Sequence, residues 1–443
     1  MERNIMKEIL KNIIVGAPGS YNMFHLEIEI GGKTMYERNP TIFHEYTHYI
    51  QNMTTISGFV RLDKYIHVFL RSCSKLGSDS DDPKIPLRDY DSLMHELGDK
   101  NIENIIRSYS FGMDFDYCLG NYVFADTDLD DYTISEQEYI DHYSGLVLKI
   151  PFVAIDGKNI PINEIVIKEN MALVNSIIGY KQNDSLTVEN INEILSYAYK
   201  EYNVLFDFIN HYLPNCNILK LVYSICEISL NIYFSERVIG NILHLIQDNY
   251  EEMSKFETDK IICLIRKSIN YESVFLSLYN IIQGKVIKKT LDLFDIFINS
   301  KNQFVDILKR FYTFLIQGMK YRLTQKTFYI DNLTNEYIQI LTSAIGCPII
   351  YFKNENEYKN LLETPKYFFD DFVYLHASLK VFMILYCSNV TVCPFINLSI
   401  CTLEKNNNCS LNCLDNFYNN NYKNCLLSNA LGCTGIRQDC RNV

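Results

Sequence analysis

The chain has 443 residues, of which 48% are hydrophobic and 21% are charged. These fractions are typical of a globular protein with a buried core, and they exclude a disordered or collagen-like chain. The 41 basic and 53 acidic residues give a formal net charge of −12. This acidic balance argues against a protein that binds nucleic acid through a basic face, so we expect no nucleic-acid partner.

The sequence favours a cytoplasmic protein that has no membrane partner. The N-terminal segment, MERNIMKEILKNIIVGAPGS, carries scattered charges and lacks the apolar run of a secretory signal. The longest uncharged stretch, Val381–Leu403, contains Ser, Asn, Thr and Pro. We therefore interpret this stretch as a buried segment rather than a membrane helix.

The first predicted regular element is a strand. Phe24–Ile30 alternates apolar and polar residues with period two and is followed by Gly31-Gly32, which favours a turn. The preceding Gly16–Ser20 is rich in glycine but lacks the lysine of a phosphate-binding loop. We interpret that segment as a turn.

A long helix is predicted next, from Asn39-Pro40 to about Cys73. Asparagine is a good N-cap residue and proline suits the first helical position, so the pair marks a helix start. Lys75–Lys100 contains Gly, Ser, Asp and Pro and is interpreted as a loop or an insertion. Tyr117–Tyr143 is also acidic and poorly periodic.

The following part of the chain predicts a β-hairpin and then helices. Leu146–Ile160 reads as two strands around the turn Asp156-Gly157, and Ile162–Ile178 has a helical period. From Ser185 to about Cys387, long apolar-periodic segments predict packed helices: Val188–Tyr212, Ile218–Gln247, Phe304–Leu323 and Tyr337–Ile345. The predicted fold class is α+β and mainly α-helical, with a small N-terminal sheet.

The sequence His44-Glu45-Tyr46-Thr47-His48 matches the pattern H-E-x-x-H. Two histidines four residues apart on a helix project from one face, so their ring nitrogens can bind one metal ion. Glu45, at the flank of that face, can then take a proton from a metal-bound water. Zinc suits such a site, because it accepts three protein ligands with an open fourth position and lowers the pKa of a bound water to about 7.

Two polar residues follow the motif on the same helix face, Gln51 and Asn52. They are candidates for orienting the metal ligands by hydrogen bonds from behind. The alternative is that they are ordinary polar positions on a half-exposed helix. Core contacts are predicted for Ile50, Met53, Ile56 and Phe59.

A catalytic zinc site usually has a third protein ligand. The short motif with a third histidine is absent, because Gln51 and Thr54 stand where its glycine and histidine would be. Glu169 in the helix after the hairpin is our first choice, since the small Ala172 lets that helix approach the histidine helix closely. Glu227 is the second choice, because a lone acid in an apolar helix needs a partner. Weaker candidates are Glu236, His67, His211 and His244.

At this point the sequence resembles a known family. Phe43–Phe59, FHEYTHYIQNMTTISGF, resembles a group of largely uncharacterised bacterial proteins that carry HEYTH-x-x-Q within the zincin-like metallopeptidases. Glu169–Ala172, ENMA, is similar to the Glu-x-x-Ala helix that supplies the third ligand in the glutamate-type branch, although the chain lacks the N-E-x-x-S-D form of the better-known enzymes. The resemblance implies a set of site residues: the zinc ligands His44, His48 and Glu169 and the general base Glu45.

These observations predict a zinc metallopeptidase in which Glu45 activates a water that attacks a peptide carbonyl, so the expected partner is a peptide or protein substrate. The strand Phe24–Ile30 is predicted to pair with the extended substrate by edge addition, and a Tyr or His is expected to stabilise the oxyanion. The alternative is a non-catalytic binding or structural protein whose zinc ties the helices together, which a closed site with four protein ligands would indicate.

Three regions are predicted along the chain: residues 1–184 as a zincin-like metal-binding domain with insertions, 185–386 as a helical domain, and 387–443 as a Cys-rich tail. The tail has no C-x-x-C pair, so it does not match the common zinc-finger spacings. A disulfide-linked tail, an irregular metal site and reduced thiols all stay open. In a third hypothesis, this tail holds the relevant metal.

Overall fold

The computed structural model describes residues 19–22, 26–32, 35–63, 66, 126–140, 147–181, 195, 200–297, 303–324, 345, 346, 348–353, 355 and 357–359. Several predictions lie outside these residues: the loop Lys75–Lys100, His67, the stretch Val381–Leu403, the Cys-rich tail, and Tyr337–Ile345 except for its last residue. Within the described part, the fold is α+β and mainly helical, as the sequence predicts. None of the helices described there combines the length and the apolar character needed to cross a membrane.

A four-stranded sheet lies beside the predicted metal helix. It consists of β1 (Gly19–Asn22), β2 (Glu27–Ile30), β6 (Ile349–Phe352) and β7 (Glu357–Lys359), in the order β1-β2-β6-β7. Strand β2 is parallel to β6, and the other neighbours are antiparallel. The predicted strand is thus present as β2, whereas the predicted turn at Gly16–Ser20 is wrong for its last two residues, which pair with β2.

Helix α2 (Met35–Thr54) carries the H-E-x-x-H motif and begins earlier than predicted. The predicted start at Asn39-Pro40 is wrong, because α2 already includes the residues before this pair. Contacts of the Arg38 side chain stabilise this first helical turn. The Arg38 side chain donates to the Gly32 carbonyl over 2.7 Å and pairs with Glu355 at 2.7 Å. Tertiary contacts therefore outweigh the local capping preference at this end of the helix.

The predicted uninterrupted helix to Cys73 is also wrong, because the chain breaks at Thr55 before a second helical segment, 56–63. The Thr55 hydroxyl donates to the Gln51 carbonyl over 2.6 Å and accepts from the Gly58 N–H at 3.0 Å. The same side chain thus occupies the last turn of α2 and caps the next segment.

The predicted hairpin is confirmed within a three-stranded sheet of β3 (Ile134–Ile140), β4 (Val147–Ile155) and β5 (Lys158–Pro161). Asp156 and Gly157 both have positive φ, 52° and 70°, as a type I′ turn requires. Strand β3 lies in the segment that the sequence presents as poorly periodic. It is an edge strand whose described side chains are mostly exposed, so burial imposes no alternation on its sequence.

Helix α7 (Glu164–Lys181) confirms the helix predicted after the hairpin, and Asn163 caps it by accepting from the Val166 N–H at 3.0 Å. In the described part of the chain, six further helices follow: α9 (Lys200–Tyr212), α10 (Ile218–Leu230), α11 (Ser235–Met253), α12 (Thr258–Ser268), α13 (Tyr271–Phe297) and α14 (Gln303–Thr324). The prediction of one helix over Ile218–Gln247 is wrong, because the chain turns between α10 and α11, where Phe234 has a positive φ of 63°. Helix α14 agrees with its prediction.

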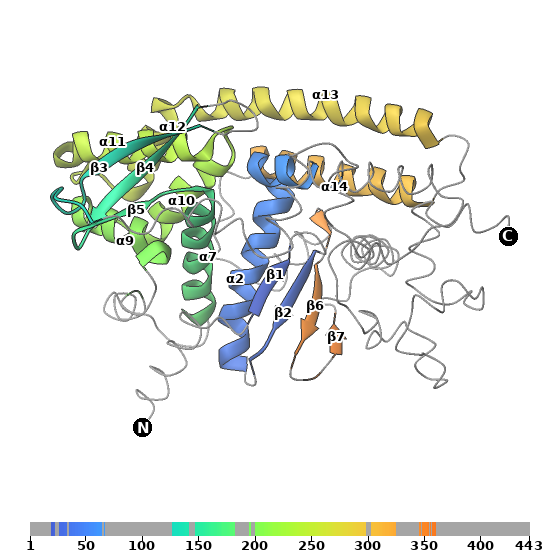
Figure 1. The fold of residues 1–443 in the computed structure, drawn as a ribbon, viewed down its shortest axis with the longest axis horizontal. Coiled ribbons are helices and arrows are strands. Elements are labelled where there is room, and N and C mark those ends of the chain that lie inside the picture. Colours follow the sequence, from blue (N-terminus) through green and yellow to red (C-terminus); the bar gives the residue numbers. More distant parts are fainter. Residues whose placement is uncertain are drawn as a thin grey trace.

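Helix α2 lies between the four-stranded sheet and α7, as Figure 1 shows. The three-stranded sheet and helices α9 to α12 gather on the far side of α7, and α13 and α14 cross near the C-terminal end of α2. One buried core contains residues of β2, α2, α7, α10 and α14. Elements on both sides of the predicted boundary at residue 184 therefore share this core.

A buried ion pair joins three helices at the C-terminal end of α2. Arg322 of α14 and Glu227 of α10 are 4% and 3% exposed and bind each other through a guanidinium–carboxylate hydrogen bond. Two further guanidinium nitrogens of Arg322 donate to the Thr54 hydroxyl, over 2.9 and 2.7 Å. The positive charge of Arg322 near the C-terminal end of α2 also interacts favourably with the dipole of this helix.

We expect Arg322→Met to lower the free energy of unfolding by about 3–5 kcal/mol, because the Glu227 carboxylate would be left buried without its cation. Urea denaturation measures the change. The double variant with Glu227→Leu is expected to regain most of the loss, since neither charge then stays buried. The exposed Arg237→Met serves as control, with a change within about 0.5 kcal/mol. A single Arg322→Met variant as stable as wild type would contradict this role.

Candidate metal centre

Helix α2 presents His44 and His48 from one face, one turn apart, as the spacing predicts. Their rings meet edge to face with centroids 4.9 Å apart, and the two Nε2 atoms are separated by 3.3 Å. The helix is fixed in this orientation by buried side chains such as Tyr49, Ile50 and Met53, which pack into the core. The two imidazoles therefore converge on one point beside α2.

Helix α7 brings Glu169 to the same point from 125 positions further along the chain. Glu169 Oε2 lies 3.1 Å from His44 Nε2, and Glu169 Oε1 lies 3.4 Å from His48 Nε2. Ala172, one turn further along α7, is fully buried. Among the described residues, His44, His48 and Glu169 form the one group of His, Cys, Asp and Glu side chains spaced to hold a metal ion.

The spacing of the donor atoms fits a small tetrahedral cation. Ligand bonds of 2.0–2.1 Å at tetrahedral angles place neighbouring donor atoms about 3.3 Å apart. The two Nε2 atoms are 3.3 Å apart, and each has one oxygen of the Glu169 carboxylate at 3.1 or 3.4 Å. The side chains of His44, His48 and Glu169 are 17%, 14% and 20% exposed. Solvent thus reaches the group, as a site with an open fourth position requires.

The pKa values of Glu169 and His48 depend strongly on the charges of the neighbouring side chains. Burial alone would raise the pKa of Glu169, but His48, followed by His44, holds it well below its usual range. Burial alone would lower the pKa of His48, but the carboxylate of Glu169, aided by that of Glu45, raises it to about 9. The three side chains therefore favour a positive charge between them. Without a metal ion, the proton on His48 supplies that positive charge.

Glu45 lies beside the three converging side chains and is 4% exposed. Burial raises its pKa, against the lowering effects of His44 and His48. The backbone N–H of Tyr21, on β1, donates to its carboxylate. Strand β1 can approach this closely because Gly19 lacks a side chain, whose first carbon would lie 2.4 Å from Thr41 and 3.3 Å from Glu45.

Gln51 and Asn52 are both buried, at 0% and 4% exposure, so the alternative of polar positions on a half-exposed helix is wrong. Gln51 Oε1 lies 2.9 Å from His48 Nδ1, and Gln51 Nε2 donates to the Lys168 carbonyl over 2.9 Å. Asn52 instead lies beside the phenol of Tyr21. Gln51 thus contacts a predicted metal ligand directly.

The second choice for the third ligand is wrong, because Glu227 pairs with Arg322 in the core instead of reaching the histidines. The weaker candidates have other neighbours as well. Glu236 accepts from the backbone N–H of Glu164, the His211 ring stacks on Tyr132 with centroids 4.2 Å apart, and His244 faces Glu136 at 3.9 Å.

Sequence reasoning missed the contacts that residues of α2 make with other elements. Asn175 of α7 donates to the Thr47 hydroxyl over 2.7 Å, 128 positions away, and the backbone of Lys168 and Tyr21 contacts Gln51 and Glu45. Contacts made by backbone groups cannot be predicted from residue types, because almost every residue has the same backbone donor and acceptor. The Asn175 amide could have been suspected, because a polar residue in an apolar helix needs a partner.

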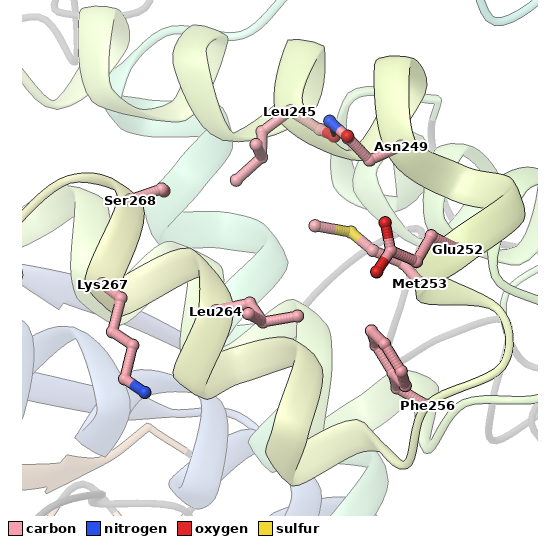
Figure 2. A pocket seen from close by; sticks show the side chains of 8 residues that line it. All are labelled: Leu245, Asn249, Glu252, Met253, Phe256, Leu264, Lys267 and Ser268. Atoms are coloured by element: carbon pink, nitrogen blue, oxygen red, sulfur yellow. Dashed lines mark hydrogen bonds between the residues drawn. The ribbon is translucent and has the colours of Figure 1, made fainter.

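A pocket of about 400 Å³ opens elsewhere, between α11 and α12. Figure 2 shows Met253 and Phe256 facing Leu264 across it, with Glu252 near the rim. Its lining also includes Leu245, Asn249, Lys267 and Ser268. It contains no residue of the metal group, so it belongs to the helical layer and not to the candidate centre.

Comparison with known proteins identifies no relative. No family model matches the sequence, no curated protein matches it, and no solved structure matches the fold. The interpretation of the site therefore depends on its geometry and chemistry.

We expect zinc affinity to rise with pH, roughly tenfold per unit between pH 7 and 8.5. Below pH 9 His48 carries a proton that the metal must displace, whereas Glu169 is already ionised in this range. Chelator competition at several pH values measures the slope, and calorimetry in buffers of different ionisation enthalpy measures the released proton. An affinity independent of pH over this range would contradict the assignment.

Proposed function

We propose that the protein is a zinc-dependent metallopeptidase, with His44, His48 and Glu169 as metal ligands. The observation that carries this proposal is the convergence of the two imidazole nitrogens on the Glu169 carboxylate, with neighbouring atoms 3.1–3.4 Å apart and all three side chains partly exposed. The donor set of two imidazoles and one carboxylate is also a set found in catalytic zinc sites. The motif and its resemblance to zincin-like enzymes support the same function.

Zinc, when bound, acts as a Lewis acid and lowers the pKa of a coordinated water to about 7. Glu45 would act as the general base that takes a proton from the attacking water, and then as the general acid that gives it to the leaving amine. Its position favours this role: the carboxylate adjoins the ligands, is held by the Tyr21 N–H, and has a pKa raised by burial. A raised pKa brings a carboxyl group closer to neutrality, where proton exchange is most effective.

The predicted pairing of substrate with the strand Phe24–Ile30 is wrong, because β2 is hydrogen-bonded on both sides, to β1 and β6. Strand β1 is one of the two outer strands of the described sheet, and its Tyr21 N–H contacts Glu45. An extended peptide that pairs with β1 would run beside the general base. We therefore assign substrate alignment to β1.

Glu45→Gln is the direct test of this function. The amide cannot accept the water proton, so we expect cleavage of a peptide library to fall by at least about 100-fold. Bound zinc is expected to stay at the wild-type level, because Glu45 is not a ligand. Mass spectrometry of the digested library and metal analysis measure the two quantities.

The exposed Glu251→Gln on α11 is the matched control and should cleave like wild type. Unchanged turnover in Glu45→Gln would defeat the general-base role. A wild-type protein that binds zinc but cleaves no peptide, while metal removal lowers its melting temperature greatly, would instead identify a structural zinc protein.

A further inference from the structure

Gln51 occupies a fully buried position between the two helices that carry the candidate ligands. Its side-chain amide lies between His48 Nδ1 on α2, at 2.9 Å, and the Lys168 carbonyl on α7, at 2.9 Å. Lys168 is the residue directly before Glu169 in the chain. One amide therefore bridges one ligand and the backbone that positions another.

The orientation of this amide follows from the available donors and acceptors. A backbone carbonyl can only accept, so the Gln51 nitrogen must face Lys168 and the Gln51 oxygen must face His48. An amide oxygen can also only accept, so His48 Nδ1 must carry a hydrogen. The observed contacts agree with this orientation, in which Gln51 Nε2 donates to Lys168.

A hydrogen on Nδ1 determines which nitrogen of the neutral ring can bind a metal. The lone pair is then on Nε2, and this atom faces His44 Nε2 at 3.3 Å and Glu169 Oε1 at 3.4 Å. We infer that Gln51 is a positioning residue that fixes the metal-binding tautomer and ring orientation of His48 and links it to the helix of Glu169. This inference rests on the metal role of His48 proposed above, and not on peptide hydrolysis.

Gln51→Met tests the inference, because methionine has a similar length but cannot hydrogen-bond through an amide. We expect zinc affinity, measured by chelator competition, to fall by about 10–100-fold, the usual effect of removing a group that orients a ligand. We also expect the visible absorption of the Co²⁺-substituted protein to shift, since that spectrum reports ligand geometry.

Asn175→Leu is the matched control. It removes another hydrogen bond between α2 and α7, from Asn175 to Thr47 over 2.7 Å, and this bond involves no ligand. Both variants are expected to lower the melting temperature, but Asn175→Leu should leave zinc affinity within about threefold of wild type and the Co²⁺ spectrum unchanged.

Equal losses of zinc affinity in the two variants would overturn the inference, because helix packing alone would then explain the effect. Wild-type affinity and spectrum in Gln51→Met would overturn it as well. A loss of zinc affinity in Gln51→Met alone, in a protein that cleaves no peptide, would support the role of Gln51 and remove the proposed peptidase function. The inference about Gln51 and the proposed function can therefore fail separately.

Discussion

The packing of α2 against α7 is the contact on which the candidate site depends. Neither helix holds a complete metal site: α2 supplies two imidazoles, and α7 supplies the carboxylate. The buried Ala172 and the bond from Gln51 to Lys168 hold the two helices together next to the ligands, whereas the bond from Asn175 to Thr47 joins them further along α7 without contacting a ligand. A shift of about 1 Å between them would separate the donor atoms beyond the spacing of a tetrahedral ion.

The candidate site combines buried support with partial solvent exposure. Buried polar groups contact His48 and Glu45 from within the protein, whereas the side chains of His44, His48 and Glu169 keep 14–20% of their surface exposed. In the proposed function, the buried contacts keep the ligands oriented, and the exposure admits a water and a substrate. Alignment of an extended peptide is proposed for strand β1, because this strand borders Glu45.

The sequence predicted the parts of the fold and site that depend on local chemistry. The spacing of His44 and His48, the turn at Asp156-Gly157 and the helix after it all follow from short-range rules. The resemblance ranks Glu169 above Glu227 as a metal ligand. The partner that each carboxylate binds in the fold lies more than 90 positions away along the chain, so local sequence does not predict it. The early start of α2 was missed because it depends on contacts of Arg38 with Gly32 and Glu355. The break at Thr55 was missed because it depends on the Thr55 hydroxyl, which accepts from the Gly58 N–H.

Zinc content is the most direct measurement of the central claim. The wild-type chain of 443 residues should bind about one zinc ion at the candidate centre, and a variant with both His44→Ala and Glu169→Ala should lose that ion while staying folded. The exposed Glu251→Ala variant should retain it. A double variant that still binds the same zinc would place the metal elsewhere, for example on the cysteines of residues 387–443, and would contradict the account.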